Sequence, residues 1–167
     1  ATGRELVLGN VSEFAFDKKG ARLALLVDAF GQAGNGLLLR DMASGVLAVL
    51  DSGKAAYQRL SWTENGEALA CLKGREDKDF EDKLFSVLGF TFPAGGPRKH
   101  AYDPQDDKSF PAGLTISPNR TPRWTEHLDA LLFGIHAPKK KSAAAGSGPD
   151  APAKSAEEPD ENIPDLV

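Results

Sequence analysis

Apolar and polar positions alternate in short runs along most of the chain, and one arrangement occurs three times. Each copy has a short strand of alternating apolar residues, a polar turn, and a more continuously apolar strand. The copies are "EFAFDKKGARLALLVD" from Glu13, "RLSWTENGEALACLKG" from Arg59 and "PRWTEHLDALLFGI" from Pro122. Alternation of apolar and polar residues predicts a β-strand with one buried face, and the Asp, Asn and Gly between the strands predict a turn. The sequence therefore predicts one β-hairpin used three times.

The turn of this hairpin is conserved between the first two copies and altered in the third. The first two copies align without a gap at a period of about 46 residues, which places Gly20 on Gly66. Glycine suits a turn because it adopts positive φ without strain. In the third copy Trp124 matches Trp62, but Leu128 stands where Gly66 would be. The turn prediction is therefore weaker there.

Two further strands are predicted after each of the first two hairpins. Leu37 to Arg40 and Val46 to Leu50 flank the turn "DMASG", and "KLFSVLGFTF" and "PRKHAYD" flank "PAGGP". Four strands at this period match the size of a propeller blade. We therefore predict an all-β fold, a partial β-propeller of about two and a half four-stranded antiparallel blades. The expected blades are about 11–56, about 57–112 and an incomplete 113–138.

The end of the sequence has a different composition. Residues 139–167 contain no aromatic residue and several prolines, and they are predicted to be a disordered tail, linker or inter-strand insertion. The chain also begins without Met and stops at the aliphatic "IPDLV". A blade needs a neighbour on each face, so we expect a piece of a longer polypeptide that does not close by itself.

Composition and charge exclude several classes of function. The net charge of −4 and the pI near 5.4 leave no basic stripe for nucleic acid. No run of 18 apolar residues is present to span a membrane, so a soluble protein is expected. The single cysteine, Cys71, lies in an apolar run and is predicted to be a buried small residue. The sequence does not determine the cellular compartment, and one hypothesis is that the full-length protein is periplasmic or secreted.

No catalytic or cofactor-binding pattern is found. The chain lacks the Gly-x-Ser-x-Gly elbow that exposes a serine nucleophile. His100, His127 and His136 have no cysteine or carboxylate at ligand spacing, and "REDKDFEDK" lacks the glycine of a calcium loop. We expect no catalytic residue, no metal and no cofactor.

Candidate binding residues are therefore sought in polar loops at the rim of the blades. The loops are 28–35, 75–82 and 103–111, and the candidates in them are Asp28, Asn35, Arg75, Asp79, Asp103 and Asp107. Trp62 and Trp124 recur at equivalent positions, which favours packing inside the blades over ligand binding.

"FAFDKKGARLALLV", "LSWTENGEALACLKG" and "ISPNRTPRWTEHLDALLFGI" resemble the blade hairpins of the propeller domain in prolyl oligopeptidase family serine peptidases. They are similar, less specifically, to TolB-like propellers. The turns keep the Asp-Gly centre only in part, and the Trp-Asp of WD repeats is missing. The resemblance implies a propeller that gates or orients peptide substrate for an α/β-hydrolase domain. That domain's catalytic Ser, Asp and His have no counterpart here.

Two hypotheses follow. In the first, the chain is a non-catalytic propeller segment of such a peptidase, and its partners are further blades, a C-terminal hydrolase domain of the same polypeptide, and peptide substrate. In the second, it belongs to a TolB-like or WD-like propeller that acts as a scaffold and holds a protein or peptide partner. In both hypotheses we expect no nucleic acid and no membrane as a partner.

Overall fold

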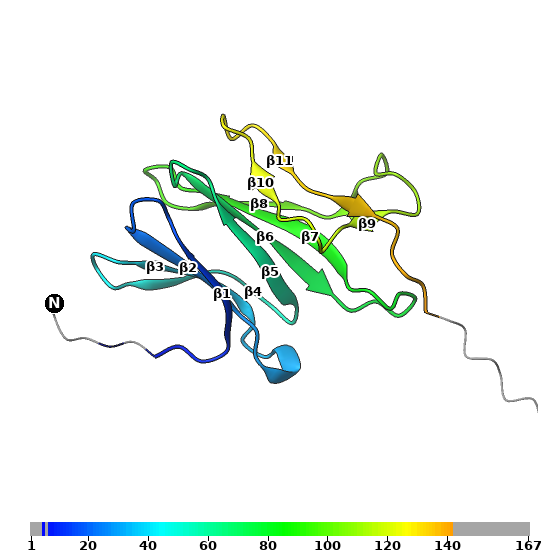
Figure 1. Ribbon diagram of the computed structural model, residues 1–167, viewed down its shortest axis with the longest axis horizontal. Coiled ribbons are helices and arrows are strands. Elements are labelled where there is room, and N and C mark those ends of the chain that lie inside the picture. The colour runs from blue at the N-terminus through cyan, green and yellow to red at the C-terminus, as the bar shows by residue number, and fades with distance from the viewer. Residues whose placement is uncertain (1–4, 6, 142–167) are drawn as a thin grey trace, which may run out of the picture.

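The computed structural model describes Glu5 and residues 7–141, and the architecture is all-β (Figure 1). The first unit is an antiparallel sheet in the order β1-β2-β3-β4. Its strands are β1 (Val11–Phe16), β2 (Arg22–Val27), β3 (Gly36–Asp41) and β4 (Leu47–Ser52). The two strands predicted after the first hairpin are confirmed: β3 extends slightly further at both ends, and β4 begins and ends slightly later than expected.

The second unit repeats this meander in the order β5-β6-β7-β8. Its strands are β5 (Ala56–Trp62), β6 (Ala68–Arg75), β7 (Leu84–Thr91) and β8 (Arg98–Tyr102). Short 3-10 turns lie in two of the connections, η1 (Phe30–Gln32) and η2 (Pro104–Asp106). The predicted strand positions are confirmed here as well, because alternating apolar runs bounded by glycine and proline are a local signal.

The third unit is one interrupted hairpin. Its pieces are β9 (Thr115–Ile116), β10 (Arg123–Trp124), β11 (Leu131–Leu132) and β12 (Ile135–His136). β10 pairs with β11 near the turn, and β9 pairs with β12 further from it. The break between them holds Pro118 and Pro122, which lack the N–H that a ladder hydrogen bond needs.

All three hairpins close with the same turn. Its hydrogen bonds run from Gly20 N to Asp17 O at 2.9 Å, from Gly66 N to Thr63 O at 3.0 Å, and from Leu128 N to Thr125 O at 3.1 Å. The residue that donates each bond has positive φ: 66° at Gly20, 76° at Gly66 and 57° at Leu128. The third turn therefore forms despite the leucine, which adopts a conformation that costs a non-glycine residue about 1 kcal/mol or more. Sequence reasoning underrated this turn.

The units pack face to face in chain order. One core cluster lies between the first and second units and includes Leu26, Leu37, Leu69 and Phe90. A second cluster joins the second and third units and includes Leu72, Phe85, Val87 and Ile116. Because successive strand residues point to opposite faces, β6 contributes Leu69 to the first cluster and Leu72 to the second. The second unit is thus covered on both faces.

We call the face of a unit toward the following unit its front and the opposite face its rear. The rear face of the second unit carries Leu60 and Trp62, which pack against the first core cluster. The same repeat positions in the first unit are Phe14 and Phe16, and they are 66% and 50% exposed. Val49 on β4 lies on the same open rear face as Phe14. Phe14 pairs with Leu25, Leu25 with Leu38, and Leu38 with Val49, and paired residues of neighbouring strands point to the same face. The rear face of the first unit is apolar and uncovered by the described residues.

The antiparallel all-β architecture is confirmed, whereas the described units do not close into a ring. The propeller and its blade boundaries therefore stay predictions. At the chain end, residues 139–141 differ from the expected disorder because they pair with the β6–β7 connection. Lys139 O accepts from Glu81 N at 2.8 Å, and Lys141 N donates to Asp79 O at 3.0 Å. The rest of the predicted disordered tail, 142–167, lies outside the described residues.

Candidate functional site: the loop end of the second and third units

The three predicted rim loops lie at one end of the stack. They are the β2–β3, β6–β7 and β8–β9 connections, and in an antiparallel meander these connections alternate with the hairpin turns at the opposite end. At the loop end of the first unit, the β2–β3 and β4–β5 connections are joined by the hydrogen bond from Gly53 N to Asn35 O at 3.1 Å.

Asn35 and Asp28 are structural residues of the first loop. Asn35 is fully buried, and its amide oxygen accepts from Ala29 N at 2.6 Å. Its amide nitrogen donates to Asp28 Oδ1 at 2.9 Å and to Ala55 O at 2.8 Å. The prediction that Asn35 is a binding residue is not supported, because its polar atoms are occupied in shaping the loop.

Arg75 and Asp103 come together from different loops. Arg75 Nη1 donates to Asp103 Oδ2 at 2.8 Å, and the other carboxylate oxygen accepts from Gln105 N at 3.0 Å. The ion pair thus ties the end of β6 to the short turn η2. Both side chains remain partly exposed, so the pair contributes modestly to stability and mainly fixes the position of the loops.

Asp107 orders the remainder of the β8–β9 connection. Its Oδ1 accepts from Ser109 Oγ at 2.6 Å, and its Oδ2 accepts from Tyr102 Oη at 2.8 Å. The hydrogen bonds from Ser109 and Tyr102 lower the pKa of the Asp107 carboxyl below its usual value. Desolvation, together with the bond to Asp107, raises the pKa of the Tyr102 hydroxyl. Asp107 therefore acts as an anionic anchor for the loop.

Asp79 contributes through its backbone to the pairing with 139–141. Next to it, Phe80 forms an antiparallel bridge with Lys140. Asp82 Oδ2 accepts from Lys139 N at 2.8 Å, and Lys141 Nζ donates to the carbonyl of Asp77 at 2.8 Å. This pairing holds the exposed β6–β7 connection against the end of the third unit.

A pocket of about 320 Å³ lies between these loops. Its lining side chains are mostly apolar, with Arg75, Asp103 and Lys140 as the charged members. The apolar residues come from both loops, from β7 and from the segment after β12: Phe80, Leu84, Phe85, Pro104, Phe110, Pro111, Leu114 and Pro138. Arg75 and Asp103 are the predicted site residues that line the pocket. Sequence reasoning missed Phe80, Phe110 and Lys140; the signal available was two phenylalanines inside otherwise polar loops.

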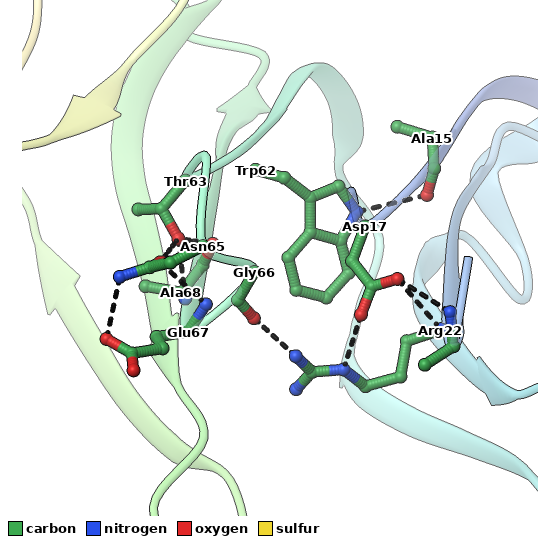
Figure 2. Close-up of polar contacts among 10 residues, drawn as sticks. Ala15, Asp17, Arg22, Trp62, Thr63, Asn65, Gly66, Glu67 and Ala68 are labelled. Carbon is green, nitrogen blue, oxygen red and sulfur yellow. Dashed lines mark hydrogen bonds and ion pairs between the residues drawn. The ribbon is translucent and has the colours of Figure 1, made fainter. Parts of the chain in front are cut away.

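Two polar clusters outside this pocket resemble binding sites but connect the first and second units. In one, the Arg22 guanidinium lies 5.1 Å from the Trp62 ring centre (Figure 2). It also lies 4.5 Å from the ring centre of Phe92. Arg22 Nε donates to Asp17 Oδ2 at 3.1 Å, and its Nη2 donates to Gly66 O. Burial raises the pKa of Asp17, but hydrogen bonds from the backbone and side chain of Arg22 outweigh it and the net pKa is lowered. The Asp17 carboxylate and Arg22 Nε and Nη2 are thus bonded within the protein.

The second cluster is centred on Asp51, which is buried. Its Oδ2 accepts from Tyr57 Oη at 2.5 Å and from Lys73 Nζ at 2.8 Å, and its Oδ1 pairs with Lys99 Nζ. Burial raises the pKa of Asp51, yet the bonds from Lys73, Lys99 and Tyr57 lower it below its usual value. The carboxylate of β4 is thereby bonded to three strands of the second unit.

The described residues offer no arrangement for covalent or metal catalysis. Cys71 is fully buried, as predicted, and burial raises the pKa of its thiol, which suppresses the thiolate. Thr91 Oγ1 and His100 Nε2 lie 3.3 Å apart on an exposed edge, where the His100 ring packs edge-on against Trp124 and no described carboxylate bonds to its other nitrogen. Among residues 5 and 7–141, no three His, Cys, Asp or Glu side chains are grouped to hold a metal ion. No helix in the same part of the chain is long and apolar enough to cross a membrane.

No protein-family model matches the sequence, and no curated protein matches it significantly.

Proposed function

We propose that the chain is a non-catalytic segment of a β-propeller whose loop end holds a peptide. The observation that carries the proposal is the repetition of the packing between units. Leu60 and Trp62 on the rear face of the second unit cover the first unit, and Phe14 and Phe16 occupy the same repeat positions on an open face. A further unit of the same kind would cover these phenylalanines, as radial stacking of blades requires.

In its more specific form, the proposal assigns the segment to a serine peptidase similar to prolyl oligopeptidase. The support is the resemblance of the hairpin sequences, together with the lack of a Gly-x-Ser-x-Gly elbow in residues 1–167. The propeller would gate or orient peptide substrate, and the hydrolase domain elsewhere in the same polypeptide would supply the catalytic Ser, Asp and His.

The alternative is a propeller that acts as a binding scaffold without a hydrolase domain. The pocket between the β6–β7 and β8–β9 connections favours it, because an apolar pocket with a few charged groups suits a protein or peptide partner. A propeller hosts many functions, so the fold does not separate the two.

Labelling with a fluorophosphonate probe separates these functions. The probe reacts with the activated serine of a serine hydrolase. The peptidase form predicts that the polypeptide encoded by the whole gene is labelled at one serine outside this sequence, while residues 1–167 alone are not labelled. Labelling of a serine within the chain would refute the non-catalytic assignment. An unlabelled whole polypeptide that still binds peptide would favour the scaffold.

A further inference from the structure

We propose that the pocket between the β6–β7 and β8–β9 connections binds one bulky apolar side chain of a peptide, with phenylalanine preferred, and that a carboxylate next to this side chain pairs with Lys140. The inference deepens the proposed function and rests on it, since it names the kind of peptide that the loop end holds.

The size and walls of the pocket indicate a single large side chain. A volume of about 320 Å³ is at the lower limit for ligand pockets, which are roughly 300–1,000 Å³. Three phenylalanines line it, Phe80 from one loop, Phe110 from the other and Phe85 from β7. Aromatic rings pair favourably with further rings in offset or edge-to-face geometry. An aromatic side chain therefore gains more here than an aliphatic one of the same area.

The charges at the pocket favour a carboxylate beside this side chain. Arg75 and Asp103 form an ion pair at 2.8 Å, so their opposite charges neutralise each other. The third charged lining residue, Lys140, is exposed and forms no ion pair with another described residue. Among the residues that line the pocket, one positive charge is thus left unpaired, and it attracts an anionic group of the ligand. Either an Asp or Glu side chain or the C-terminal carboxylate of the peptide provides this chemistry.

The pocket is held open before any ligand arrives. Asp107 and the Arg75–Asp103 pair fix the β8–β9 connection, and the pairing of 139–141 with 79–81 fixes the other wall. Ordered walls lower the entropic cost of binding, because fewer side chains are immobilised by the ligand.

The inference is tested by selecting binders to residues 1–167 from a displayed library of random peptides with free C-termini. We expect enrichment of Phe, then Tyr and Leu, next to Asp or Glu or at the C-terminus; the position of the enriched acid distinguishes the two sources of the carboxylate. The affinities of synthetic Ac-Gly-Phe-Asp-Gly-NH2 and Ac-Gly-Gly-Gly-Phe with a free carboxylate are then measured by NMR titration.

Variants of exposed residues locate the site. Ala112→Trp places a ring over the pocket and is expected to weaken binding at least tenfold. Lys140→Glu is expected to weaken binding of the carboxylate peptides by about tenfold and to improve that of Ac-Gly-Phe-Lys-Gly-NH2. Lys18→Glu changes the net charge equally at the opposite end of the stack and should leave the affinities unchanged.

No enriched sequence, or peptides whose affinity is the same for Lys140→Glu and Lys18→Glu, would overturn the inference. Fluorophosphonate labelling does not depend on this pocket, so the inference and the proposed function can fail separately.

Discussion

Removal of the Trp62 side chain tests whether the contact between the first two units stabilises the fold. In the structure Trp62 Nε1 donates to Ala15 O at 3.0 Å, and its ring contacts Arg22 and Phe92. Truncation of a buried Phe or Trp to Ala costs about 3–5 kcal/mol. Because Trp62 is only partly buried, we expect Trp62→Ala to lower the free energy of unfolding by about 3 kcal/mol, including the lost cation–π contact.

Phe16 supplies the matched control, because it occupies the same repeat position on the open rear face. It is 50% exposed, so Phe16→Ala should cost about 1 kcal/mol or less. Trp62→Phe keeps a ring but leaves the Ala15 carbonyl without its donor, and should cost about 1 kcal/mol. The values come from guanidinium chloride unfolding followed by circular dichroism. Equal costs for Trp62→Ala and Phe16→Ala would refute the face-to-face packing of the two units.

Three further predictions concern the turn, the buried carboxylate and the cysteine. Gly66→Ala should destabilise the chain by about 1 kcal/mol because φ is positive there, whereas Leu128→Gly should be neutral or stabilising; the opposite order in thermal unfolding would contradict the shared turn. The lowered pKa of Asp51 adds stability that is present above its unfolded pKa and lost as the pH falls through its folded pKa. Unfolding measured below about pH 4 should therefore depend less on pH in Asp51→Asn, and an unchanged profile would contradict this. Cys71 should react with a thiol reagent only after denaturant unfolds the chain, since its side chain is buried and its thiol pKa raised; rapid reaction of the folded chain would show that it is exposed.

The parts of the fold that local sequence determines could be predicted. Alternating apolar residues and the turn glycines located the strands of the first two units, because strand periodicity and positive φ leave a direct signature. Leu128 shows the limit of such reasoning: its side chain weakened the prediction of a turn that the pairing of β10 with β11 imposes. Tertiary contacts there outweigh a local preference of about 1 kcal/mol.

The candidate site depended on contacts between distant residues, and sequence reasoning recovered it only in part. The loop positions of Arg75 and Asp103 were predicted, but their pairing was not, since nothing local brings the end of β6 to η2. Asn35 is a polar residue of the kind expected on an exposed loop. Its amide is nevertheless buried, and the β2–β3 connection is hydrogen-bonded around it. The composition of residues 139–167 predicts disorder for Lys140. In the structure Lys140 forms a β-bridge with Phe80 and lines the pocket.

The central claim is that the rear face of the first unit receives another unit of the same kind. The most direct measurement is the reactivity of a cysteine introduced there by Phe16→Cys, in residues 1–167 and in the polypeptide encoded by the whole gene. The buried native Cys71 serves as the unreactive reference in both. We predict rapid modification of position 16 in residues 1–167 and at least tenfold slower modification in the whole polypeptide, as the covering unit excludes reagent. Equal rates in the two would contradict the claim.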